Sequence, residues 1–119
     1  MKYVDGFVIA VPKKNLKAYV RVARKAGKIW REYGALDYKE CVGDDLNVKM
    51  GVPFPRMMKV KSDETVVFSY IVFKSRAHRD QVNAKVMKDP RLTGPSAPPA
   101  MPFDVNRMVY GGFKVEVDA

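Results

Sequence analysis

The sequence is poor in the residues that build covalent or metal-bound scaffolds. Its 119 residues include one cysteine, Cys41, and one histidine, His78. A single cysteine forms no intramolecular disulfide, and no second cysteine stands at the spacing of a zinc ligand. Disulfide-stapled and zinc-finger folds are therefore excluded, and the composition favours a reducing compartment.

Long apolar runs are also missing. No apolar stretch reaches the roughly 18 residues that a membrane span needs, and Asp5 interrupts the short apolar start "YVDGFVIAV". We therefore expect a cytoplasmic protein with no membrane partner. The length suits one domain, residues 1–119, and 47% hydrophobic residues are enough for a core.

Acidic residues are scarce in one segment. Residues 13–32 hold eight bases and one acid, a net charge of +7 in a chain whose total is +9. Such a basic stripe attracts nucleic acid or another polyanion, or it serves only solubility. The candidate polyanion-binding residues are Lys17, Arg21, Arg24 and Lys28, although we regard nucleic acid as the less favoured partner.

Hydrophobic periodicity divides the chain into six main elements. Period-two or β-branched patterns predict strands over residues 3–11, 35–43, 64–73 and 107–117. Spacings of three and four predict a helix between Pro12 and Gly34, and Ser75 is the expected N-cap of a second helix that ends near Met87. Residues 44–64 are predicted to be an excursion with an edge ribbon, and residues 89–102 an extended loop rich in proline.

This order predicts an α+β domain with a ferredoxin-like βαββαβ topology and a four-stranded antiparallel sheet. Both helices then cover one face of the sheet. The other face should be polar in a monomer, but both faces of "ETVVFSYIVF" are mostly apolar. We therefore predict a homodimer in which a second copy covers that face, in preference to an RNA-stacking platform, because the strand carries no glycine and no base.

Four stretches carry a family resemblance: "YVDGFVIAVPKKN", "FPRMMKVKSDETVVFSYIVFKSRAHRD", "VMKDPRL" and "MPFDVNRMVYGGF". Together they resemble the YbaA-like family of uncharacterised bacterial proteins, a family of domains of unknown function. The resemblance implies a dimeric α+β barrel. The wider superfamily includes small monooxygenases, haem-degrading enzymes, chlorite dismutase-like proteins and ligand-binding regulators, but the resemblance carries over no catalytic residue.

Candidate functional residues are few. His78 shares a helical stripe with Val82 and Val86 and is expected to pack toward the sheet rather than to bind a metal, and a role as the base of a cofactor-free oxygenase stays open. Cys41 is expected to be a buried or half-buried spectator. Asp5 either pairs with a base such as Arg56, Lys59 or Arg107, or sits wet at the sheet edge. Tyr70 either points its hydroxyl into a cavity or packs in the core.

The stretch "MPFDVNRMVYGGF" has a structural interpretation and a functional one. Asp104 and Asn106 fit a tight turn with Asn106 left-handed, and Gly111 and Gly112 fit a bulge or a close approach of a second sheet. Phe103, Asp104 and Arg107 would also lie at the rim of a pocket. The set of candidate pocket or rim residues is Asp5, Arg56, Tyr70, His78, Phe103, Asp104 and Arg107.

Two functions remain open at this point. One is a cofactor-independent, monooxygenase-like homodimer that binds or turns over a small apolar or aromatic molecule between sheet and helices, with no cofactor and no metal. The other is a non-catalytic binding module with weak polyanion or RNA binding through the basic first helix. Whether the protein is an enzyme is left undecided.

Overall fold

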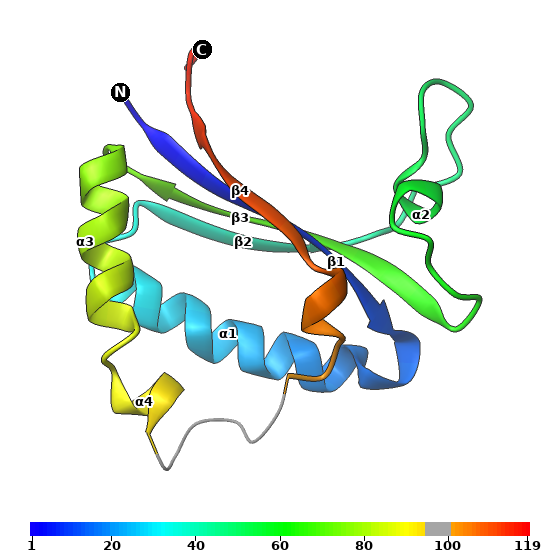
Figure 1. Cartoon of the computed structure of the whole chain (residues 1–119), viewed down its shortest axis with the longest axis horizontal. Coiled ribbons are helices and arrows are strands. Elements are labelled where there is room, and N and C mark those ends of the chain that lie inside the picture. The colour runs from blue at the N-terminus through cyan, green and yellow to red at the C-terminus, as the bar shows by residue number, and fades with distance from the viewer. Residues whose placement is uncertain (95–100) are drawn as a thin grey trace.

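One antiparallel sheet, with the two long helices packed on one side, organises the chain (Figure 1). The computed structural model describes residues 1–94 and 101–119. Its strands are β1 (Tyr3–Pro12), β2 (Asp37–Val42), β3 (Glu64–Phe73) and β4 (Val109–Lys114), in the spatial order β2-β3-β1-β4. All three strand pairs are antiparallel. The predicted ferredoxin-like βαββαβ topology is confirmed.

Two long helices cover the same face of the sheet. Helix α1 (Leu16–Glu32) follows β1 through the 3-10 turn η1 (Lys13–Asn15), and Gly34 ends it with a φ of +114°, a conformation that glycine adopts without strain. Helix α3 (Arg76–Val86) begins at Ser75, whose Oγ accepts the His78 backbone N–H at 3.0 Å. Both predicted helices and their capping residues are confirmed.

The predicted edge ribbon in residues 44–64 is wrong. The segment forms no strand before β3 and contains a short helix, α2 (Phe54–Met57), instead. Pro53 is the N-cap and Pro55 lies in the first turn, where a missing N–H costs no helical hydrogen bond. The two prolines therefore start a helix here rather than only preventing a strand.

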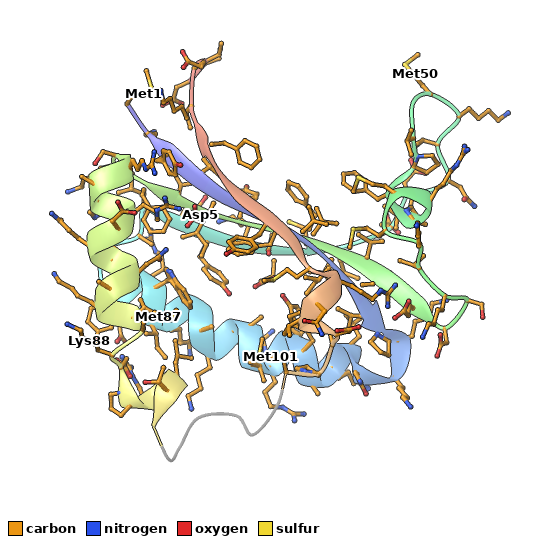
Figure 2. All side chains as sticks on the ribbon, viewed as in Figure 1. Met1, Asp5, Met50, Met87, Lys88 and Met101 are labelled. Atoms are coloured by element: carbon orange, nitrogen blue, oxygen red, sulfur yellow. The ribbon has the colours of Figure 1, made fainter. Side chains whose placement is uncertain are left out.

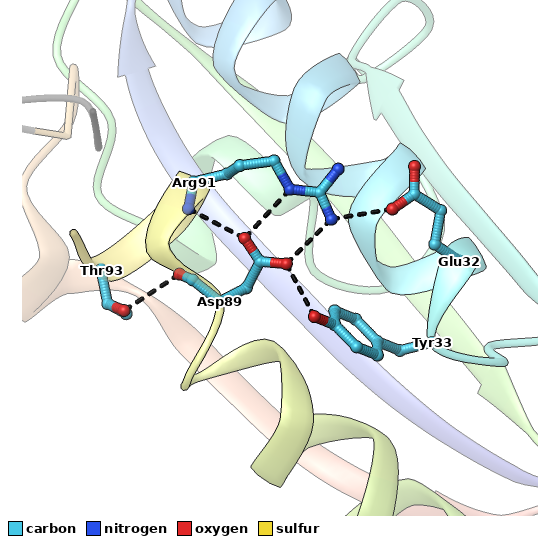
Figure 3. A network of polar contacts seen from close by, with 5 residues as sticks. All are labelled: Glu32, Tyr33, Asp89, Arg91 and Thr93. Atoms are coloured by element: carbon cyan, nitrogen blue, oxygen red, sulfur yellow. Dashed lines mark hydrogen bonds and ion pairs between the residues drawn. The ribbon is translucent and has the colours of Figure 1, made fainter. Parts of the chain in front are cut away.

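The proline-rich segment 89–102 is not wholly extended. It contains the short helix α4 (Pro90–Thr93), and the part of the predicted loop at residues 95–100 lies outside the described residues. Figure 3 shows how α4 is held. The buried Asp89 caps its N-terminus and accepts hydrogen bonds from the Tyr33 hydroxyl at 2.8 Å and the Arg91 side chain. Arg91 also donates to Glu32 at 2.8 Å, so this network fixes α4 to the end of α1.

The hydrophobic core between sheet and helices is divided into two clusters. One gathers around Phe73 and Val82, and the other around Val11 and Tyr19. Ile71 from the first cluster and Ile9 from the second both line the cavity described below. The cavity therefore borders both clusters at the middle of the sheet.

Candidate functional site

A cavity of about 660 Å³ lies between the helix-covered face of the sheet and helices α1 and α3. Aromatic and methionine side chains provide much of its wall. In Figure 2, Asp5 lies on the sheet, Met87 at the end of α3 and Met101 in the segment that precedes the 3-10 turn η2 (Val105–Arg107). The aromatic members are Phe7, Tyr19, Trp30, Tyr38, Phe103 and Tyr110.

A first polar cluster joins β1 to both helices. Arg79 Nη1 donates to Asp5 Oδ1 at 2.7 Å, and Asn83 Nδ2 lies 3.5 Å from Asp5 Oδ2. Trp30 Nε1 donates to Asn83 Oδ1 at 3.0 Å. The buried Asp5 carboxylate is thus paired, as the cost of burying an isolated charge requires. The alternative, in which Asp5 is a solvent-exposed carboxylate at the sheet edge, is wrong.

A second polar cluster lies on β2 and α1. Glu40 Oε1 accepts the Tyr19 hydroxyl at 2.7 Å, and Glu40 Oε2 accepts the Tyr38 hydroxyl at 2.7 Å. Burial, reinforced by the neighbouring carboxylate, raises the pKa of both tyrosines well above 10, so each stays a donor. The mostly apolar cavity thus contains the carboxylate of Glu40, which can accept a hydrogen bond or a proton from a bound molecule.

The opposite face of the sheet has little cover. It carries apolar side chains that alternate with those of the cavity: Val4, Val8, Phe68, Tyr70, Val72, Val109 and Phe113. Phe68 is 42% exposed, Val109 54% and Phe113 61%. Phe54 of α2 meets the edge of Phe68 with ring centroids 6.3 Å apart. The two apolar faces expected from the sequence are present.

Comparison with known proteins shows which family the chain belongs to. A family model described as "Protein of unknown function (DUF1428)" matches residues 2–105. The chain belongs to this family. The uncharacterised protein YbaA of Escherichia coli K12 is 43% identical over 118 residues, which cover 99% of both chains. The uncharacterised YbaA of Shigella flexneri matches with the same identity and coverage.

A solved structure supports the fold of this DUF1428 chain. The crystal structure of a dimeric ferredoxin-like protein from an uncultured marine organism matches with a TM-score of 0.60 over 100% of both chains. The sequence identity is 12%, so this likeness concerns the fold alone. Within residues 1–94 and 101–119, no helix is long and apolar enough to cross a bilayer.

The structure of the DUF1428 chain brings two of the seven candidate residues into the cavity wall, Asp5 and Phe103. The bases proposed as partners of Asp5 lie elsewhere. Arg107 makes a two-pronged ion pair with Glu64, at 2.7 and 3.0 Å, and Arg56 is exposed on α2. Asp5 pairs with Arg79 instead.

The remaining candidates lie outside the cavity wall. Tyr70 lies on the open face with Phe68, since it alternates with the cavity residues Ser69 and Ile71. His78 meets the edge of Phe73, and its Nδ1 accepts the Lys74 backbone N–H at 3.0 Å. Asp104 is exposed and caps η2.

The expectations for Asn106 and Cys41 were wrong, and one of the two alternatives for Gly111 and Gly112 is excluded. Asn106 lies inside η2 and is not among the described residues with positive φ. β4 pairs with β1 in continuous register through Gly111 and Gly112, so no bulge forms there. Cys41 is exposed, because it lies on the edge strand β2 and alternates with the cavity-facing Glu40.

The sequence interpretation missed most of the polar groups in the cavity, although two patterns could have revealed them. Tyr38 and Glu40 stand two apart on one strand, which places both on the same face of a sheet. Arg79 and Asn83 stand four apart on one helix, which stacks them on one side. Each pair places polar side chains between the sheet and the helices, where apolar residues are expected.

Proposed function

We propose that this chain is a homodimeric α+β barrel in which each subunit binds a small molecule with an aromatic or otherwise apolar body. The observation that carries the proposal is the cavity of about 660 Å³ between sheet and helices. Ligand pockets of roughly 300–1,000 Å³ with mostly apolar walls and a few convergent polar groups are typical of small-molecule sites. Here those polar groups are the Asp5–Arg79–Asn83 cluster and the Glu40 cluster.

The shape of the wall suits a flat apolar body. Phe7 stacks on Tyr110 with ring centroids 5.8 Å apart, and Tyr19 meets the edge of Phe103 at 5.7 Å. Trp30 and Tyr38 stand 6.1 Å apart on the α1 and β2 side. Aromatic walls offer large apolar area together with ring faces and edges that pack well against another ring.

The homodimer part rests on the open face of the sheet. Burying a patch that includes Phe68, Val109 and Phe113 releases roughly 25 cal/mol per Å² of apolar area, which favours association. A second sheet packed face to face, about 10 Å away, would cover all three side chains at once. The structural neighbour of this fold is itself described as dimeric.

Ligand binding can be tested with the chain's own fluorophore. Trp30 is the only tryptophan and lines the cavity, so 4-phenyl-1-butanol should change its fluorescence and raise the melting temperature. Ala26 also lines the cavity, and Ala26→Phe should fill it and weaken binding at least about tenfold. Ala18→Phe, on the exposed side of α1, is the matched control. No binding by wild type, or binding by Ala26→Phe that is as tight as by wild type, would contradict the proposal.

The dimer has a separate test. Light scattering should give about twice the chain mass of 13.5 kDa at micromolar concentration. Phe113→Asp places a charge on the open face and should shift the protein toward a monomer. Met50→Asp is the control, because Met50 is 90% exposed but lies in the loop before α2. A monomeric wild type would refute the dimer.

Turnover without a cofactor, which the family resemblance suggests, would need an electron-rich aromatic that loses a proton before it reacts with dioxygen. Glu40 is the cavity group placed to accept such a proton, since the two tyrosine hydroxyls orient its carboxylate and leave one acceptor position free on each oxygen. Oxygen uptake with 1-naphthol, abolished in Glu40→Gln, would support this activity. Equal uptake by wild type and Glu40→Gln would contradict it.

The basic surface of α1 supports a second candidate, weak polyanion binding. Lys17, Arg21, Arg24 and Lys28 are exposed, and none forms an ion pair with the carboxylates of the described chain. Binding to a short duplex should fall steeply with salt, because released counterions drive it. A gel shift that persists at about 0.1 M salt and is lost in Arg21→Glu/Arg24→Glu would support it. No shift at that salt concentration removes it.

A further inference from the structure

The charges inside the cavity are unbalanced. Its wall holds three carboxylates, Asp5, Glu40 and Asp80, and one base, Arg79. Arg79 is already occupied, because it contacts Asp5 at 2.7 Å and Asp80 at 2.8 Å. The Asp80 side chain is 62% exposed, so water screens its charge at the rim. Glu40 is therefore the uncompensated charge deeper in the wall.

Glu40 is held by neutral donors. Tyr19 and Tyr38 each give it one hydroxyl hydrogen bond at 2.7 Å, which orients the carboxylate and leaves its negative charge in place. Each carboxylate oxygen has two acceptor positions, so each keeps one for another donor. Among the described residues, no lysine, arginine or histidine forms an ion pair with Glu40.

Basic residues do lie on the far side of this wall. Glu40 also borders a groove between α1 and β2, together with Arg24, Lys28 and Arg31 of α1 and Lys39 of β2. All four bases are exposed, and none comes within ion-pair distance of Glu40. Their attraction acts through solvent and is screened, so it does not replace a cation inside the cavity.

A metal ion is a poor occupant for this position. Within residues 1–94 and 101–119, no three His, Cys, Asp or Glu side chains are grouped as ligands. Hydroxyl donors from two tyrosines also surround the carboxylate, whereas a metal site would present further oxygen or nitrogen acceptors. Aromatic rings line the same space, and ring faces attract organic cations.

We propose that the ligand of this cavity is an amine, with an aromatic or apolar body against the aromatic wall and a protonated nitrogen on Glu40. The inference rests on the proposed ligand-binding function and specifies its substrate class. An ammonium group would donate to the free acceptor positions of Glu40 in a charge-assisted hydrogen bond. A carboxylate ligand would instead meet Glu40 as a like charge, with Arg79 already paired.

The test compares three molecules that share a phenyl group on a four-carbon chain and differ in the terminal polar group: 4-phenylbutylamine, 4-phenyl-1-butanol and 4-phenylbutyrate. Trp30 fluorescence and calorimetry on the wild-type chain, at about 0.15 M salt, should show the amine binding at least about tenfold more tightly than the alcohol. The carboxylate should bind more weakly than the alcohol. An alcohol that binds as tightly as the amine would overturn the inference while leaving the proposed binding function intact.

Variants test whether Glu40 causes the preference for the amine over the alcohol. Glu40→Gln should bring the amine-to-alcohol ratio near one and change alcohol binding by less than about threefold, because glutamine keeps the shape and loses the charge. Asp45→Asn removes an exposed carboxylate that does not line the cavity, and it should keep the ratio. A ratio unchanged in Glu40→Gln would overturn the assignment to Glu40. If Glu40→Gln does not fold, the wild-type comparison of the three molecules decides the ligand class. Tyr38→Phe keeps the charge of Glu40 but removes one of the two hydroxyls that orient it, so this variant should lower the amine-to-alcohol ratio without bringing it to one.

Discussion

Arg79 on α3 and Asp5 on β1 are 74 positions apart in the chain, and their charged groups lie 2.7 Å apart. The Asp5 side chain is 7% exposed and that of Arg79 is 19% exposed. Arg79 also lies over the ring of Tyr3, 4.9 Å from its centroid. One side chain thus connects α3 to the first strand and lines the cavity.

Removing this arginine should cost more stability than the pair itself contributes. Arg79→Leu leaves the buried Asp5 carboxylate without a cation, and we expect a loss of about 3 kcal/mol in the free energy of unfolding. Asp5→Asn/Arg79→Leu should recover a large part of that loss, because the buried charge is gone. Urea unfolding measures both variants.

Arg76→Leu is the control for this pair, since Arg76 is exposed on the same helix. It should change the free energy of unfolding by no more than about 0.5 kcal/mol. If Arg79→Leu were as mild as Arg76→Leu, the ion pair would not be holding α3 to β1.

The fold was predictable because each element has its own local pattern. "ETVVFSYIVF" is β3 at its predicted bounds, and Ser75 and Gly34 delimit helices as their side-chain chemistry and backbone freedom indicate. The partner of Asp5 was not predictable in this way. Three bases were considered, and the actual one comes from a helix whose rotation relative to β1 depends on the packing of Val82 and Val86. Local periodicity carries no information on such contacts.

Gly27 lies in the middle of α1, where alanine would favour the helix by about 1 kcal/mol. A Cβ at this position would lie 2.8 Å from Cδ1 of Tyr38, so the ring would have to move. Gly27→Ala should therefore change stability little, because the two effects oppose each other. It should weaken binding of 4-phenylbutylamine at least about fivefold, since Tyr38 would no longer orient Glu40.

The control for Gly27→Ala is Lys25→Ala, an exposed change on the same helix. Calorimetric titration and thermal unfolding should show normal binding for Lys25→Ala. Normal binding by Gly27→Ala as well would mean that the Tyr38 ring has no part in the site.

Two adjacent glycines on β4 should respond differently to the same substitution. A Cβ on Gly112 would lie 2.6 Å from Cε2 of Tyr3, a buried ring, whereas the nearest atom to a Cβ on Gly111 is 3.9 Å away on Phe113. Gly112→Ala should destabilise the fold by about 1–3 kcal/mol through overpacking. Gly111→Ala should be close to neutral in a monomer, as measured by urea unfolding.

The glycine pair also bears on the proposed homodimer, because Gly111 lies on the open face of the sheet with Val109 and Phe113. If a second sheet approaches closely there, Gly111→Ala should weaken the dimer in light scattering while the fold stays intact. Equal losses of stability in both variants would contradict the contact between Gly112 and Tyr3.

Acid should weaken the attachment of η2 to β3. Hydrogen bonds from the Arg107 side chain, aided by the Lys61 backbone N–H, lower the pKa of Glu64 from 4.5 to about 2. The folded protein therefore keeps Glu64 ionised at pH values where the unfolded chain binds a proton. Its contribution to stability is complete above about pH 4.5 and is lost as the pH falls toward about 2.

Arg107→Gln removes the cause of this shift and should be less stable than wild type at neutral pH. The difference in free energy of unfolding should shrink between about pH 4.5 and about pH 2, because protonated Glu64 no longer benefits from the guanidinium. Arg56→Gln, an exposed change on α2, should show no such dependence. Urea titrations across this pH range measure the difference in free energy of unfolding. If wild type were as much more stable than Arg107→Gln near pH 2 as at neutral pH, the ionised Glu64 carboxylate would not be the group through which Arg107 stabilises the fold.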